Sequence, residues 1–179
     1  MNLYKEYSYQ IKSMLNFCSP FFKNIGYFGE YPSQQQFQEL VENNFIYFID
    51  LTTLREREKL KYNYSFDIPK YKSLIYVNYS IIDNNIPSSS KLFKEFLEFL
   101  ITILKKKAKV YIHCRGGHGR SSLIVSSFLC ATFLYSPYKA FTVTKFYHEN
   151  RKNLKAKYKG QICPKLYHQR KFVIDFFSR

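Results

Sequence analysis

The chain has 179 residues, of which 46% are hydrophobic and 23% are charged. This length suits one domain, and the composition is typical of a globular protein rather than a disordered chain. The longest nearly uncharged apolar run, residues 123–135, is shorter than the ~18 residues of a membrane span. Residues 1–6 lack the basic-then-apolar order of a secretory signal. We therefore do not expect a membrane span or an exported protein.

The net charge of +15 is unevenly distributed along the chain. Residues 1–90 contain nine basic and nine acidic side chains, whereas residues 91–179 contain 19 basic and four acidic ones. We therefore expect a positive surface in the C-terminal half. Such a surface attracts phosphoproteins, phosphoinositides or nucleic acid without choosing among them.

The four cysteines, Cys18, Cys114, Cys130 and Cys163, form no CxxC pair, and a disulfide scaffold would be denser and more patterned. We therefore expect a reducing compartment, the cytoplasm or the nucleus. The excess of Lys, Asn, Ile, Phe and Tyr is typical of an AT-rich genome, including that of a virus.

The first half of the chain predicts both helices and strands. Apolar residues spaced by three and four predict an amphipathic helix over residues 3–17. A short strand or hairpin is expected over 25–31, and a helix follows Ser33, which can cap it. Nearly continuous apolar runs predict buried strands over 45–51 and 74–79.

In the second half, the pattern predicts an amphipathic helix over 91–107, a strand over 110–113 and an apolar, buried helix over 121–135. Two further helices are expected up to residues 151 and 177. This alternation predicts one α/β domain over residues 20–179, with a central, mostly parallel sheet flanked by helices. The helix within residues 1–19 either packs on its own domain or exchanges with a second copy to make a dimer.

The chemistry is concentrated between the strand over 110–113 and the next helix. This segment, the glycine loop, runs from His113 to Ser121 and contains Gly116, Gly117 and Gly119. Glycines let successive N–H groups point inward at a helix N-terminus, where an anion binds well. Cys114 lies at the loop entrance, where the helix dipole favours the thiolate. The loop is completed by Arg115, His118 and Arg120, of which Arg120 can hold two phosphate oxygens with its planar fork.

The pattern His-Cys-x5-Arg-Ser resembles the active-site loop of the cysteine-based protein tyrosine phosphatases, especially their small dual-specificity branch. Residues 81–88, which contain Asp83 and Pro87, are similar to the general-acid loop of that family. Gln169 resembles a glutamine found in the last helix of many members, and the resemblance implies a role in positioning water. Arg151 resembles an arginine that follows the second helix after the loop, with no catalytic role implied.

The resemblance implies a mechanism in two steps. The Cys114 thiolate attacks phosphorus while Asp83 protonates the leaving oxygen, and Asp83 then acts as base towards water. Arg120 and the loop amides hold the phosphoryl oxygens, and Ser121 hydrogen-bonds to the sulfur and stabilises the departing thiolate. The implied substrate is phosphotyrosine in proteins, and phosphoserine or phosphothreonine as well. No metal and no cofactor are required.

Other interpretations of the same residues remain open. RNA 5′-phosphates or phosphoinositides would suit Arg115, His118 and the basic half of the chain. A non-catalytic phosphate-binding adaptor is a further alternative, which the intact set of Cys114, Asp83 and Arg120 disfavours. A zinc site formed by His113, Cys114 and His118 with Cys163 and His168 matches no common ligand spacing. Asp50 and Asp67 compete with Asp83 as the acid, although Asp50 ends a strand and is expected to be structural.

Overall fold

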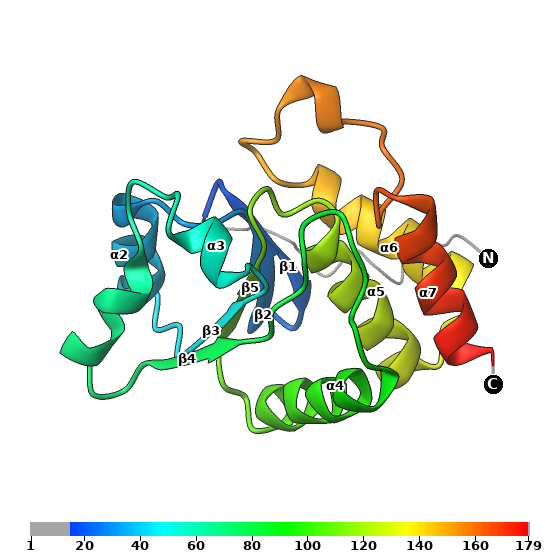
Figure 1. Ribbon diagram of the computed structural model, residues 1–179, viewed down its shortest axis with the longest axis horizontal. Coiled ribbons are helices and arrows are strands. Elements are labelled where there is room, and N and C mark those ends of the chain that lie inside the picture. The colour runs from blue at the N-terminus through cyan, green and yellow to red at the C-terminus, as the bar shows by residue number, and fades with distance from the viewer. Residues whose placement is uncertain (1–14, 179) are drawn as a thin grey trace.

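The computed structural model describes residues 15–178, which form a five-stranded sheet with helices on both faces (Figure 1). The strands are β1 (Cys18–Phe22), β2 (Gly26–Gly29), β3 (Tyr47–Asp50), β4 (Ile75–Asn78) and β5 (Val110–His113). The α-helices are α2 (Gln34–Glu42), α3 (Leu54–Arg57), α4 (Ser90–Lys105), α5 (Arg120–Phe133), α6 (Pro137–Glu149) and α7 (Tyr167–Phe177). Three short 3-10 helices are η1 (Tyr64–Phe66), η2 (Ile68–Lys70) and η3 (Ala156–Tyr158).

The strand order is β1-β2-β5-β3-β4, and only the β1–β2 pair is antiparallel. The central strand β5 is fully buried, as expected of a parallel strand covered on both faces. His113, its last residue, pairs with Gly29 of β2 and Asp50 of β3. Three parallel strands therefore end side by side, at the edge of the sheet where ligands bind in open α/β folds.

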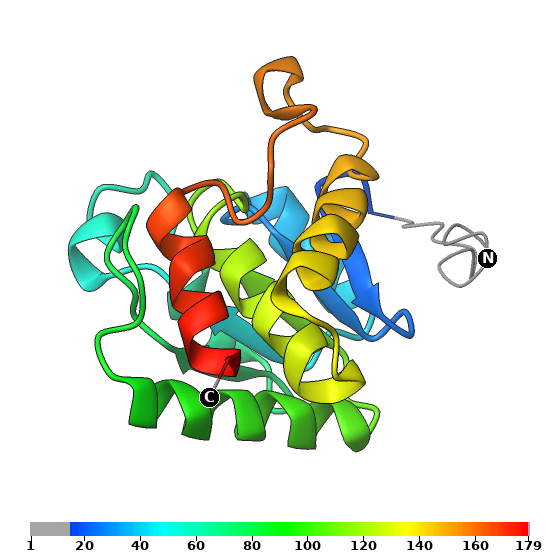
Figure 2. The same ribbon diagram turned by 90° about the vertical axis from the view of Figure 1, so that its right-hand side faces the viewer.

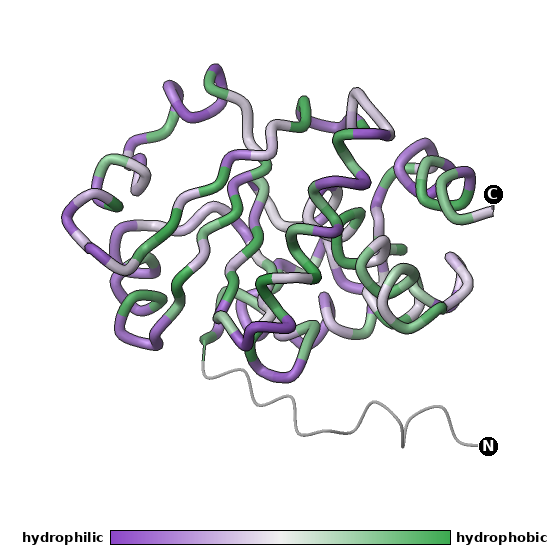
Figure 3. Tube along the Cα trace, turned by 90° about the horizontal axis from the view of Figure 1, so that it is seen from below, coloured by the Kyte–Doolittle hydropathy of each residue, from purple (hydrophilic) through white to green (hydrophobic). Residues whose placement is uncertain are grey.

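The helices form two layers. In Figure 1, α2 and α3 lie on one side of the sheet and α4, α5, α6 and α7 on the other. The larger core lies under the second layer and includes Phe28, Leu100, Leu129 and Val173. The smaller core, beneath α2, is aromatic and includes Phe37, Phe48, Tyr64 and Tyr111. In Figure 3 the hydrophobic residues concentrate along the strands and inner helix faces, and hydrophilic ones gather in the outer turns.

The expected single α/β domain with a mostly parallel sheet is confirmed. The buried helix after the glycine loop is also confirmed, since α5 is buried along 11 of its 14 residues. No helix among residues 15–178 is both long and apolar enough to cross a membrane. The four cysteines are buried, and none of them forms a disulfide.

Two strands differ from the sequence-based expectation. The hairpin begins earlier than expected, with β1 at Cys18–Phe22. This strand contains Pro20, and a proline normally argues against a strand. Proline is tolerated here because β1 is an edge strand and has a register shift next to Pro20. The prediction that the strand over 74–79 is buried is wrong: β4 is the other edge strand, and Ile75 is 41% exposed.

The helix expected over residues 3–17 lies almost entirely outside the described residues. Its last three residues form a bend and turn rather than a helix, and they lead directly into β1. The expected domain boundary after residue 19 therefore falls inside β1. The proposed exchange of the N-terminal helix between two copies stays a prediction.

The packing of α4 generates a test of the larger core. Leu100 is completely buried, whereas Leu92 on the same helix is 55% exposed. Leu100→Ala should therefore reduce the free energy of unfolding by about 2–5 kcal/mol, because it leaves a cavity. Leu92→Ala, the matched control, should change it by less than ~1 kcal/mol. Urea unfolding measures both, and equal losses would contradict this assignment of the two faces.

Candidate active site

The glycine loop connects the end of β5 to the beginning of α5, as expected. Its backbone is fixed from both neighbouring strands, since the Leu51 amide donates to the His113 carbonyl and the Tyr31 amide to the Arg115 carbonyl. Gly117 has a φ of +73°, and a Cβ there would lie 2.5 Å from the Gly29 oxygen. Only glycine fits this position, because both the conformation and the space exclude a side chain.

Cys114 lies at the base of the loop and is 3% exposed. Its sulfur accepts a hydrogen bond of 3.2 Å from the Gly117 amide, so a loop N–H points at the candidate nucleophile. The predicted bond from Ser121 is not formed: the Ser121 hydroxyl is buried and has no partner among the described residues. The Cys114 sulfur accepts from the Gly117 amide instead, and the Ser121 hydroxyl remains available to donate a hydrogen bond.

Arg120 begins α5, yet its side chain is 2% exposed, and both of its terminal nitrogens donate hydrogen bonds. Its Nη1 and Nη2 donate to the two carboxylate oxygens of Glu56, each at 2.8 Å. Nη1 also donates to the Ile81 carbonyl and Nη2 to Asp83 Oδ1, again at 2.8 Å. A bidentate Arg–carboxylate pair is among the strongest hydrogen-bonded arrangements in proteins, so the orientation of the guanidinium is fixed.

The sequence analysis missed Glu56. Glu56 caps α3 together with Thr53: the Thr53 hydroxyl accepts from the Glu56 amide, and the Glu56 carboxylate accepts from the Thr53 amide. Burial alone would raise the pKa of Glu56, but the hydrogen bonds from Arg120 and Thr53 and the charge of Arg120 outweigh burial and lower it. Glu56 is therefore an anion at neutral pH. The Thr-x-x-Glu spacing could have predicted the cap of α3, but it does not indicate that Glu56 pairs with Arg120, which lies 64 residues later in the chain.

Asp83 and Gln169 are both brought to the glycine loop. Asp83 lies between β4 and α4, is half-exposed and contacts Arg120 as described above. Gln169 is completely buried in α7, donates to the Asn85 carbonyl and lies against Gly119, where a Cβ would come within 3.0 Å of its Oε1. The last helix thus touches both the loop of Asp83 and the glycine loop.

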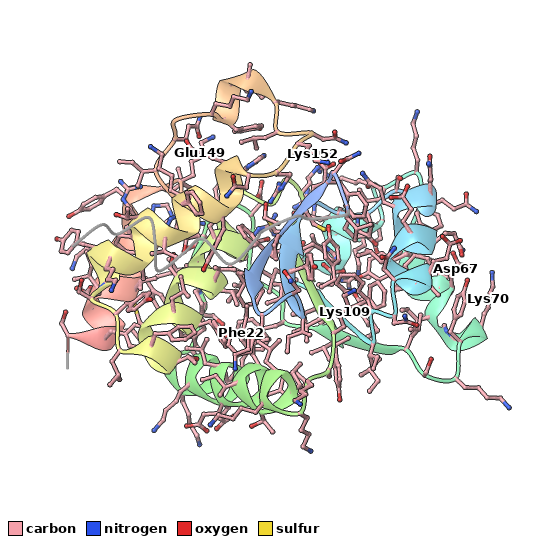
Figure 4. All side chains as sticks on the ribbon, turned by 180° about the vertical axis from the view of Figure 1, so that it is seen from behind. Phe22, Asp67, Lys70, Lys109, Glu149 and Lys152 are labelled. Carbon is pink, nitrogen blue, oxygen red and sulfur yellow. The ribbon has the colours of Figure 1, made fainter. Side chains whose placement is uncertain are left out.

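His113 and Asp50 support the loop from within the fold. The buried His113 ring shares a 2.6 Å hydrogen bond with the Tyr64 hydroxyl, and burial lowers the pKa of His113. Asp50 accepts from the amide and hydroxyl of Thr52 and from the Tyr76 hydroxyl, so its predicted structural role is confirmed. Asp67 binds Tyr62 and Lys70 (Figure 4), and it does not line the pocket described below.

His118 and Arg151 form the other side of the site. His118 Nδ1 lies 2.6 Å from His148 Nε2, and burial lowers the pKa of His118 to about 3 and that of His148 to about 4. Both rings are therefore neutral at pH 7. Arg151 is buried and reaches the carbonyls of Phe28 and Gly117 at 3.5 and 3.4 Å. Arg151 thereby links the glycine loop to β2.

These elements enclose a pocket of about 400 Å³. Cys114, Arg115, Gly116, His118, Gly119 and Arg120 of the glycine loop line it together with Asp83 and Gln169. The structure therefore brings together the predicted nucleophile, acid, phosphate-binding arginine and glutamine. No three side chains of the His, Cys, Asp and Glu types gather as a metal site within residues 15–178.

Comparison with known proteins identifies the family to which the chain belongs. A family model described as "Polymorphic toxin system, DSP-PTPase phosphatase" matches residues 26–133, which contain the glycine loop and Asp83. The chain belongs to the dual-specificity branch of the cysteine-dependent protein tyrosine phosphatases. It is accordingly a phosphatase.

Two viral proteins are similar in sequence. The chain is 36% identical over 167 residues to "Putative tyrosine phosphatase 067L" of Invertebrate iridescent virus 3, covering 92% of this chain and 67% of the relative. It is 35% identical over 128 residues to "Putative tyrosine phosphatase 197R" of Invertebrate iridescent virus 6, covering 70% and 46%. The chain thus spans two-thirds of one relative and less than half of the other. Both relatives are viral proteins, and a virus is among the AT-rich sources expected from the composition.

The fold is also found among solved structures. The crystal structure of Tk-PTP in the active form superposes with a TM-score of 0.68 at 18% identity, covering 90% of this chain and 97% of that one. At this identity the likeness concerns the fold. It shows that the chain has the fold of Tk-PTP.

The Glu56–Arg120 pair generates a prediction about this site. Glu56→Gln keeps the shape but removes the charge that holds the buried Arg120, so unfolding should become easier by about 3 kcal/mol. Phosphatase activity on an aryl phosphate should fall about 10–100-fold, because Arg120 is no longer held in place. The control is Glu58→Gln, an exposed residue of the same segment, which should change neither quantity appreciably. Full activity of Glu56→Gln would refute the positioning role.

Proposed function

We propose that this phosphatase hydrolyses phosphotyrosine in proteins, and phosphoserine or phosphothreonine as well, through a phosphocysteine on Cys114. The observation that carries the proposal is that Cys114, Arg120 and Asp83 line one pocket, with Asp83 bonded to Arg120. A nucleophile, a bidentate phosphate ligand and a proton donor are the groups that two-step phosphoryl transfer requires.

In the first step, the Cys114 thiolate attacks phosphorus as the bond from phosphorus to the tyrosine oxygen breaks. Asp83 in its protonated form gives its proton to that oxygen. The loop amides and Arg120 stabilise the charge on the three equatorial oxygens. Asp83 reaches this position because it lies next to Arg120, and its exposed side chain can leave that contact when substrate enters.

In the second step, water attacks the phosphocysteine and Asp83 accepts its proton. The sulfur departs as a thiolate, which the Gly117 amide and the unpaired Ser121 hydroxyl stabilise. Gln169 positions the attacking water in this proposal, and its contact with Gly119 at the wall of the pocket supports that role.

The nucleophile can be tested by removing its sulfur. Cys114→Ser should abolish hydrolysis of a phosphotyrosine peptide while the protein still binds that peptide, because the loop amides and Arg120 remain. Cys130→Ala, which removes another buried thiol, should remain active. Release of phosphate and peptide binding are measured on the same preparations. Unchanged turnover by the serine variant would sink the proposal, whereas tight binding without any wild-type turnover would favour an adaptor.

The acid can be tested by varying the leaving group. Asp83→Asn should lower the rate roughly 10²–10⁴-fold with phosphotyrosine, whose oxygen needs a proton. The loss should shrink with nitrophenyl phosphate, because its leaving group, nitrophenolate, departs readily without a proton. Asp67→Asn, a change to an aspartate outside the pocket, is the control. Equal losses with both leaving groups would show that Asp83 only shapes its loop.

A further inference from the structure

The segment between β4 and α4, residues 79–89, carries Asp83 and is called the acid loop here. The Asn85 amide donates to the Ile82 carbonyl at 3.0 Å and thereby closes a turn. The two central residues of this turn are Asp83 and Asn84, and Asn84 has a φ of +58°. The direction of the Asp83 side chain therefore depends on what holds the turn in place.

Two consecutive residues of α7 bind two consecutive carbonyls of this turn. His168 Nε2 lies 2.7 Å from the Asn84 carbonyl oxygen, and the side-chain amide of Gln169 donates to the Asn85 carbonyl at 3.1 Å. A carbonyl oxygen can only accept, so the His168 ring donates through its Nε2–H. Figure 2 shows α7 in red, with the green segment that leads into α4 beside the beginning of α7.

Helix α7 is anchored on the domain, so it is a fixed support for the acid loop. Phe172 and Phe176 lie one turn apart on α7, and each packs edge-on against Phe93 of α4 with ring centroids 5.0 Å apart. Val173, between them, is completely buried in the larger core. Since α4 begins directly after the acid loop, α7 contacts both the loop and the helix that follows it.

His168 and Gln169 differ in what else they contact. Gln169 is buried and lies against Gly119, so a change at Gln169 would also disturb the glycine loop. His168 is exposed and lines a separate cavity of about 450 Å³ together with Ile86 and Phe172, outside the catalytic pocket. A change at His168 therefore reaches the chemistry through the acid loop.

We propose that His168 is a positioning residue for the general acid, because its bond to the Asn84 carbonyl keeps the preceding Asp83 carboxyl directed at the leaving oxygen. In the structure, Arg120 also holds the Asp83 side chain. When a phosphoryl group binds the Arg120 guanidinium, Asp83 loses that contact and is held by its loop. The His168 bond lies outside the pocket and persists at that moment. This proposal rests on the proposed role of Asp83 as the acid.

The positioning role is tested by kcat/KM for two aryl phosphates, because kcat/KM includes the step in which the leaving oxygen takes its proton. His168→Ala should lower kcat/KM for phenyl phosphate, a poor leaving group, about three- to tenfold, as expected for one neutral hydrogen bond. The value for nitrophenyl phosphate should change less than about twofold. His168→Gln should restore most of the loss, since its amide can donate in place of Nε2–H.

The matched control removes another exposed ring from the beginning of α7. Tyr167 is 71% exposed, and Tyr167→Ala should leave both values of kcat/KM within about twofold of wild type. In the Asp83→Asn background, His168→Ala should cause no further loss with phenyl phosphate, because no acid is left to position. Equal losses with both aryl phosphates, or full additivity of the two substitutions, would overturn the positioning role.

Hydrogen exchange separates this proposal from the proposed function, because it requires no turnover. The Asn85 amide should exchange about three- to tenfold faster in His168→Ala than in the wild type, since the turn that it closes has lost a support. Unchanged exchange would overturn the role of His168 whatever the activity. Accelerated exchange together with equal losses for Asp83→Asn on both aryl phosphates would instead contradict the proposed acid, while the hold of His168 on the loop stands.

Discussion

Arg120 is the residue through which the parts of the active site are joined. Its guanidinium is bonded to Glu56 at the start of α3, to the Ile81 carbonyl and to Asp83, while its backbone begins α5. A buried cation requires compensation, and the bidentate Glu56 carboxylate provides it. The consequence is that the nucleophile loop, the segment after β3 and the loop of the acid are all fixed by one side chain.

The sheet explains why these segments can meet there. β5 lies between β2 and β3, and the three parallel strands end in register at Gly29, His113 and Asp50. The glycine loop, α3 and the Asp83 loop therefore all leave the sheet on its carboxyl side. Asp50 and His113, buried beneath them, bind Thr52, Tyr76 and Tyr64. The floor of the site is thus a hydrogen-bonded aromatic layer rather than a simple apolar core.

The glycine loop and the alternation of strands and helices could be predicted from sequence because both are local patterns. The strand that contains Pro20 could not be predicted, since a proline is tolerated in β1 only because β1 lies at the edge of the sheet. The exposure of β4 was missed for the related reason that an apolar run does not reveal which strand lacks a neighbour. Glu56 was missed because its pairing with Arg120 spans 64 residues of chain. Residues 150–166 were predicted only as part of the basic C-terminal half, because the stacking of Tyr158 on His118 requires the fold.

One backbone hydrogen bond links the segment between α6 and α7, residues 150–166, to the opposite end of the described chain. The Asn153 amide donates to the Asn16 carbonyl at 3.0 Å, two residues before β1 begins. Asn153 also lines the catalytic pocket. The entry to the β1–β2 hairpin, although it provides no catalytic group, is thus tied by a backbone hydrogen bond to a segment that lines the catalytic pocket.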